Sequence, residues 1–122
     1  MPRSKPVAAW LQDMLTAAKE AGQFVDGSTW PEYQKNLLLR RAVERSVEII
    51  GEAARQIPRE FQEAHPEVPW TKIMRQRHRL AHDYDLIEDE TIWRVATVHV
   101  PELIRTLQPL IPPIPPDPEP EH

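Results

Sequence analysis

Apolar residues recur every three or four positions along most of the chain. The first such run covers residues 6–25, the second extends from about residue 37 to 57, a third begins at Trp70, and the last covers about residues 90–110. This spacing is that of amphipathic helices, and no segment shows the sustained alternation of a half-buried strand. The pattern therefore predicts an all-α bundle of four to five helices.

Glycine, proline and a hydroxyl-bearing residue indicate where these helices begin and end. Gly27 follows the first run, and glycine can adopt the left-handed conformation that closes a helix. Thr29 is expected to cap a short helical turn. Pro58 should end the second run, and the polar stretch 59–69 should hold at most one turn of helix. Pro101 lies inside the last run and should kink that helix.

The end of the chain has a different composition. Seven of the 14 prolines lie in residues 109–122. A segment of this kind favours extended polyproline II over helix or sheet. We therefore expect a helical domain over residues 1–110 and a disordered, proline-rich tail over residues 111–122. The tail is either solvated or a ligand for an aromatic groove on a partner.

Composition narrows the classes of function. The formal net charge of −4 over 122 residues argues against a broadly basic nucleic-acid binder, although it leaves room for a small basic site. The absence of cysteine excludes disulfides and thiolate metal sites and fits a reducing cytosol. No apolar run approaches the roughly 18 residues of a membrane span, and the N-terminus does not resemble a signal peptide. We expect a cytoplasmic protein that is not embedded in a membrane.

The steepest change of charge along the chain lies between residues 71–82 and 83–90. The first segment holds four cations and two histidines without an acid, and the second holds five acids. This boundary predicts a local anion site on an acidic body. The histidines have no carboxylate at metal-ligand spacing, so no metal and no cofactor are expected. His99 is expected to be a hydrogen-bonded core residue of the last helix.

Arg77 stands out because it interrupts an apolar stripe between Met74 and Leu80. In a structural interpretation, its aliphatic part lies along the stripe while the guanidinium reaches solvent, or it pairs with a carboxylate on a neighbouring helix. In a functional interpretation, it points into a cleft and binds a phosphate with two hydrogen bonds. His82 follows five residues later, about 140° around a continuous helix, so the two side chains should not share a face. Either the helix ends near His82, or the site is assembled across two helices, most simply in a dimer.

Histidine and arginine together suffice for one reaction that needs no metal. RNA carries a 2′-hydroxyl next to each phosphodiester. A histidine can accept the proton of that hydroxyl, and an arginine can stabilise the charge that develops on the phosphoryl oxygens. The products would be a 2′,3′-cyclic phosphate and a 5′-hydroxyl. The residue types permit this chemistry without demonstrating it.

The segment RHRLAHDY, from Arg77 to Tyr84, resembles the R-x4-H-x-Y motif of the HepT-like toxins in the HEPN superfamily. Other stretches resemble the same family in order, namely residues 11–15, 42–53, 68–70, 92–93 and 101–103. The resemblance spans about residues 7–110 and implies a HEPN-type antiparallel helical bundle. Gly51 matches a conspicuous Gly-Glu pair of the family's long helix, and we expect close helix packing there.

The resemblance implies a role for each residue of the motif. Arg77 and His82 match the catalytic pair. His78 stands where HepT-like proteins commonly have asparagine or aspartate, and it is either a second proton carrier or a hydrogen-bonding support. Arg79 is expected to support the site. Tyr84 matches the tyrosine that an antitoxin modifies with AMP in some systems.

The resemblance also implies partners. It indicates a metal-independent endoribonuclease toxin of a type II/VII-like toxin–antitoxin system, with RNA rather than DNA as substrate. The antitoxin would be an MntA-like minimal nucleotidyltransferase, and the toxin a homodimer with both motifs facing one cleft. Trp70 and Trp93, near the motif, are a further reason to expect a dimer. The alternative is a non-catalytic HEPN subunit that docks onto a nucleotidyltransferase and helps to present nucleotide.

Overall fold

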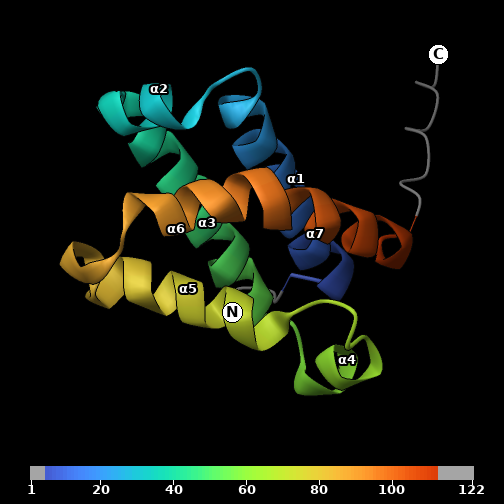
Figure 1. Cartoon of the computed structure of the whole chain (residues 1–122). Helices are drawn as coiled ribbons and strands as arrows, with labels where there is room; N and C mark the ends of the chain where they lie inside the picture. The colour runs from blue at the N-terminus through green and yellow to red at the C-terminus, as the bar shows by residue number, and fades with distance from the viewer. Residues whose placement is uncertain (1–4, 113–122) are drawn as a thin grey trace, which may run out of the picture.

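The computed structural model describes residues 5–112, which form helices and turns without any strand (Figure 1). The elements are α1 (Val7–Val25), α2 (Trp30–Lys35), α3 (Leu37–Arg55), α4 (Arg59–Ala64), α5 (Trp70–His82), the 3-10 turn η1 (Tyr84–Leu86), α6 (Asp89–Arg94), the π-helical segment η2 (Val95–His99), α7 (Val100–Leu107) and the 3-10 turn η3 (Gln108–Leu110). The all-α prediction is confirmed. Most of the predicted tail, residues 113–122, lies outside the described residues. None of the described helices is both long and apolar enough to cross a membrane.

Helix α3 lies at the centre of the bundle. It packs against α1 and α5, and α6, η2 and α7 follow one another as a single rod that crosses in front of it (Figure 1). Helix α5 and this α6–α7 rod run in opposite directions. Four long helical segments therefore make up the described bundle, with α2 and α4 as short additions.

Two apolar clusters hold α5 in place at both of its ends. Trp70, at its start, belongs to a cluster with residues of α1, α3 and α7. Leu80, near its end, belongs to a second cluster with residues of α2, α3 and α6. Each of the two side chains is almost completely buried. The helix that carries the motif is thus fixed at two points, which limits how far its polar side chains can move.

The ends of the first two predicted helices agree with the structure to within two residues, and the last helix ends at Leu107, three residues early, and continues as the 3-10 turn η3. Gly27 has a φ of 77° directly after α1, as expected for a glycine that closes a helix. Thr29 Oγ1 accepts a hydrogen bond from the backbone N–H of Glu32 at 3.4 Å, which caps α2. Helix α3 ends at Arg55, although Ile57 beyond it is still buried.

The connection between α3 and α5 is more helical than expected. It contains α4, six residues long, instead of at most one turn. The side-chain amide of Gln62 donates to the backbone carbonyls of Ala54 and Ile57 at 3.3 and 3.0 Å. These bonds attach α4 to the end of α3, a tertiary contact that the local sequence does not reveal.

The last helix is widened rather than simply kinked before Pro101. The backbone N–H of Val100 donates to the carbonyl of Val95, five residues earlier, which defines the π-helical turn η2. A wide turn of this kind takes up one extra residue and rotates the side chains within it. His99 is therefore exposed, and the prediction that it belongs to the core is wrong. The buried stripe is as predicted: Ile92, Ala96, Val100, Leu103 and Leu107.

Candidate functional site

Helix α5 presents the two histidines of the motif at its C-terminal end. The N–H of Asp83 donates to the carbonyl of Arg79 at 2.8 Å and closes the helix, so that His82 is its last residue. His78 and His82 are both exposed, one turn apart, and their ring centroids are 4.7 Å from each other. Of the two alternatives that the sequence left open, the helix that ends near His82 is the one observed.

A pocket of about 380 Å³ lies beside these histidines. It is lined by Arg55, Met74, Arg77, His78 and His82. We call it the motif pocket. Arg77 and His82 thus line one pocket within a single chain, although five residues separate them on α5 and their positions lie on different faces of the helix. The arginine side chain is long enough to reach around the helix from its own position.

The position of Arg77 is set by a close approach of α5 to α3. A Cβ atom added to Gly51 of α3 would lie 2.1 Å from the Cβ of Arg77 and 3.2 Å from the backbone oxygen of Ile73. No side chain fits at this crossing, so the predicted close packing at Gly51 is confirmed. The base of the Arg77 side chain rests directly on the backbone of α3.

The guanidinium of Arg77 has no carboxylate partner among residues 5–112. The side chain is half-buried, and its Nε is buried without a hydrogen-bond partner. A buried donor left without a partner costs about 1–3 kcal/mol. An anion in the motif pocket would remove that cost only when the side chain turns this nitrogen towards it. The position of Arg77 in the pocket, without a carboxylate partner in the described residues, favours the phosphate-binding interpretation over the ion-pair interpretation.

Arg55 is a second cation of the motif pocket that the sequence analysis did not single out. It is exposed at the end of α3, and no ion pair involving it is found in the described part of the chain. Arg45, on the same helix, differs because it contacts the carboxylates of Glu48 and Glu52, both at 3.3 Å. One signal was present in the sequence: Arg55 follows Gly51 by four residues, which places the two on the same face of a helix.

One predicted site residue, Arg79, does not line the motif pocket. Arg79 points away from it and lines a larger groove on the other side of α5. The side chain of Tyr84 lies outside the described residues, so its expected modification stays a prediction.

The two tryptophans near the motif are engaged within the chain. Trp70 is buried, and its Nε1 donates to the carbonyl of His65 at 2.9 Å. The ring of Trp93 packs against Trp30 and Tyr33, with centroids 6.2 and 5.1 Å apart. The expectation that these residues serve a dimer interface therefore has no support from their packing.

The marked pKa shifts lie away from the motif pocket. Burial raises the pKa of the Tyr33 hydroxyl well above its usual range, and burial likewise raises the pKa of the Glu44 carboxyl. Tyr33 belongs to α2 and Glu44 to the first half of α3, at the end of α3 that lies away from Arg55. Within residues 5–112, no three histidine or acidic side chains are grouped so that they could hold a metal ion.

Comparison with known proteins identifies the family. The model of the family described as "Ribonuclease HepT-like" matches residues 14–110. "Putative RNase MJ0127" of Methanocaldococcus jannaschii is 37% identical over 111 residues, which is 91% of each chain. "Putative RNase TTE0752" of Caldanaerobacter subterraneus is 33% identical over 102 residues, 84% of this chain and 91% of the relative.

A third relative has a name that agrees with the family model. "Probable ribonuclease HepT" of Thermococcus cleftensis is 31% identical over 94 residues, 77% of this chain and 86% of the relative. No solved structure matches. On the family model and these relatives, the chain belongs to the HepT-like ribonuclease family of the HEPN superfamily.

Proposed function

We propose that this protein is an endoribonuclease that cleaves RNA without a metal ion, with Arg77 and His82 as the catalytic residues. The observation that carries this proposal is that both side chains line one pocket while the arginine has no carboxylate partner in residues 5–112. The names of two relatives, "Putative RNase MJ0127" and "Probable ribonuclease HepT", support RNA as the substrate class.

In this mechanism His82 accepts the proton of the 2′-hydroxyl. The 2′-oxygen then attacks the adjacent phosphorus, an O2′–P bond forms and the P–O5′ bond breaks. The leaving 5′-oxygen needs a proton, and protonated His78 can supply it because its ring is 4.7 Å from that of His82. The products are a 2′,3′-cyclic phosphate and a 5′-hydroxyl.

Arg77 stabilises the charge that accumulates on the phosphoryl oxygens in the transition state. The contact with Gly51 supports this role, because it fixes the base of the arginine side chain before substrate arrives. Arg55 adds a second positive charge to the same pocket. Since it is exposed, we assign it to phosphate binding in the ground state rather than to the transition state.

The proposal includes a biological setting and an assembly. We propose that the ribonuclease is the toxin of a toxin–antitoxin pair, that an MntA-like minimal nucleotidyltransferase neutralises it by adding AMP to Tyr84, and that it acts as a homodimer. The resemblance of the motif supports all three. The histidines of the open motif pocket are exposed, so a second chain has room to cover a bound RNA there.

Cleavage of a labelled RNA in excess EDTA tests the catalytic proposal. His82→Ala should abolish cleavage, and Arg77→Ala should reduce it by roughly 100-fold or more, as expected when a partner of transition-state charge is removed. Arg59→Ala is the matched control, because Arg59 is an exposed arginine of α4 that lies outside the motif pocket. Equal losses in the variants and the control, or loss of wild-type activity in EDTA, would contradict the proposal.

The regulatory part is tested at Tyr84. Tyr84→Phe removes the acceptor hydroxyl, so this variant should stay active when incubated with the nucleotidyltransferase and ATP, whereas the wild-type chain should be silenced and gain the mass of AMP. Silencing of both chains without an adduct would mean that the partner inhibits by binding alone. Light scattering on the same samples should report twice the 14.2 kDa chain mass.

A further inference from the structure

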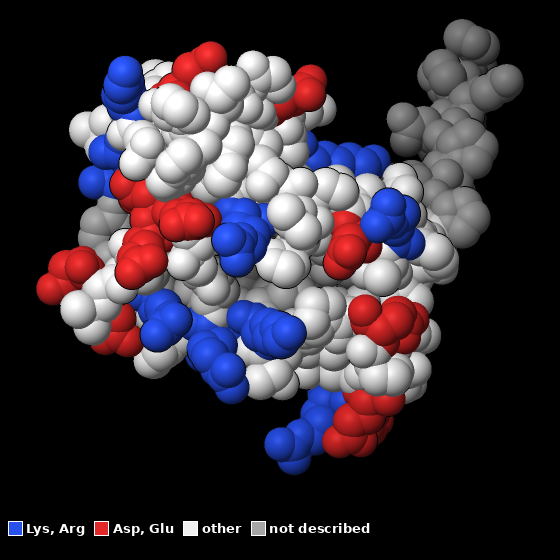
Figure 2. Space-filling view, in the orientation of Figure 1, with Lys and Arg blue, Asp and Glu red and all other residues white. Residues whose placement is uncertain are grey.

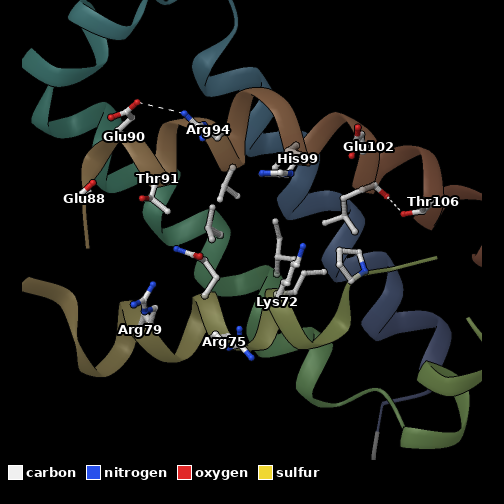
Figure 3. A pocket seen from close by; sticks show the side chains of 18 of the residues that line it. Lys72, Arg75, Arg79, Glu88, Glu90, Thr91, Arg94, His99, Glu102 and Thr106 are labelled. Atoms are coloured by element: carbon white, nitrogen blue, oxygen red, sulfur yellow. Dashed lines mark hydrogen bonds and ion pairs between the residues drawn. The ribbon is translucent and has the colours of Figure 1, made fainter. Parts of the chain in front are cut away.

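A groove of about 880 Å³ lies on the side of α5 that faces away from the motif pocket (Figure 3). Helix α5 forms one wall, and the α6–α7 rod forms the other. Val47 and Ile50 of α3 contribute to its floor. We call it the α5–α7 groove. The proposed cleavage chemistry uses none of its space.

The α5 wall of this groove is positively charged. It carries Lys72, Arg75 and Arg79, and none of the three takes part in an ion pair within residues 5–112. Lys72 and Arg79 extend towards the opposite wall, and Arg75 lies at the outer edge of α5 (Figure 3). Figure 2 shows the lysine and arginine side chains gathered along α5 and the acidic ones gathered above them, near the start of α6. The rest of the groove is lined by Arg94 and by four acids, Glu67, Glu88, Glu90 and Glu102, so the net positive charge is confined to the α5 wall, and an anion would bind along that wall.

The floor of the groove differs from its wall. It is apolar, except that the side-chain amide nitrogen of Gln76 is buried there without a hydrogen-bond partner. Because this nitrogen is covered, a ligand satisfies it only when the Gln76 side chain turns into the groove, and such a ligand must present a hydrogen-bond acceptor at its edge and an apolar face to the floor. A nucleobase has these properties.

The charged wall continues to the motif. Arg75 precedes His78 by three residues and Arg79 precedes His82 by three, so each pair is adjacent on the surface of α5. All four side chains are exposed. A strand held at the motif pocket can therefore pass over α5 and enter the groove without a break in positive charge.

We propose that the α5–α7 groove binds the nucleotides of single-stranded RNA that lie next to the cleaved phosphodiester. Their phosphates contact Lys72, Arg75 and Arg79, and one base lies on the apolar floor and accepts a hydrogen bond from Gln76. Glu88 and Glu102 on the opposite wall can accept hydrogen bonds from exocyclic amino groups. The strand is single because a base must leave its stack to reach the floor. This inference rests on the proposed function.

The salt dependence of RNA binding distinguishes cations that contact RNA in the groove from cations that only add to the overall charge of the protein. We would measure binding of a labelled single-stranded RNA of about 12 nucleotides by fluorescence anisotropy in EDTA, with His82→Ala in every protein so that the RNA stays intact. Lys72→Ala with Arg75→Ala should make the slope of log affinity against log salt shallower by about 1.4. Between about 50 and 200 mM salt, the double variant should therefore lose about sevenfold less affinity than the protein with both cations. The matched control, Lys19→Ala with Arg59→Ala, removes one lysine and one arginine that are exposed and lie outside the groove.

Gln76→Leu gives a second readout, because it keeps the volume and removes the amide. It should weaken binding by roughly two- to tenfold, as for loss of a neutral hydrogen bond, and leave the salt slope as it is. Equal slopes in the groove and control pairs, or unchanged affinity in Gln76→Leu, would overturn the inference. If the chain with His82 intact still cleaves RNA in that case, the proposed function stands and only the groove is wrong. A chain that neither cleaves nor binds RNA would refute both.

Discussion

The two sides of α5 are built differently. On one side the helix touches the backbone of α3 at Gly51, and a small pocket gathers two arginines and two histidines without a carboxylate. On the other side α5 and the α6–α7 rod stand apart, and the larger groove between them has charges of both signs. One helix therefore has a tightly packed face and an open one.

This difference fits a division of work between reaction and binding. Catalytic groups must be held to within a fraction of an ångström, and tight packing achieves this. A surface that binds RNA of varying sequence needs room for different bases and flexible charged side chains that can follow the phosphates. Breaking the packing at Gly51 should therefore affect the chemistry much more than the same kind of change elsewhere.

Gly51→Ala should have the largest effect. The added Cβ would lie 2.1 Å from the Cβ of Arg77, so α5 must shift away from α3. A displacement of about 1 Å at a catalytic group can cost 100-fold in rate, and overpacking costs about 1–3 kcal/mol of stability. RNA cleavage and denaturant unfolding of the same preparation measure both effects.

Gly22→Ala is the matched control. Its added Cβ would lie 3.8 Å from the side chain of Val100, an ordinary contact, so the variant should gain up to about 1 kcal/mol of stability from helix propensity. Cleavage should follow the amount of folded protein. If Gly51→Ala behaved like Gly22→Ala, the close approach of α3 and α5 would not control Arg77.

Arg55→Ala should have an intermediate effect. It removes an exposed cation from the motif pocket and leaves the packing unchanged, so we expect about a tenfold loss of kcat/KM, mainly through KM. Unfolding should be nearly unaffected. A loss of activity as large as that for Arg77→Ala would mean that Arg55 also stabilises the transition state. Unchanged activity would mean that Arg55 does not contact the substrate.

His99→Ala should have the smallest effect on stability. The side chain is exposed on the wall of the groove, and surface substitutions of this kind usually change the free energy of unfolding by less than about 0.5 kcal/mol. A decrease of several kcal/mol in the free energy of unfolding would instead mean that His99 is buried in the core, as the apolar spacing of the sequence predicted.

The sequence predicted the helices well because their spacing is a local property. The buried stripe of the last helix and the stop at Gly27 follow from residues close together in the chain. The error at His99 arises from the π-helical turn, which changes the helical period at one place. The π-turn also lies beside Pro101, which has no backbone N–H to continue an α-helical ladder.

The candidate site was predicted only in part, because a pocket depends on how helices cross. The motif identified Arg77 and His82, and the structure brings them together. Arg55 reads in the sequence as a cation at a helix C-terminus, where the helix dipole alone favours it. Only the crossing of α3 and α5 makes it part of the site. The α5–α7 groove likewise depends on tertiary packing, although the charge boundary indicated its cationic wall.

An RNA with one 2′-deoxy nucleotide at a mapped cleavage position tests the 2′-hydroxyl mechanism most directly. In excess EDTA, the wild-type chain should cut the all-ribose RNA and leave 2′,3′-cyclic phosphate ends. Cleavage at the deoxy position should be lost, because the attacking oxygen is missing, while cleavage at other positions continues. Cleavage that persists at the deoxy position would contradict the proposed roles of Arg77 and His82.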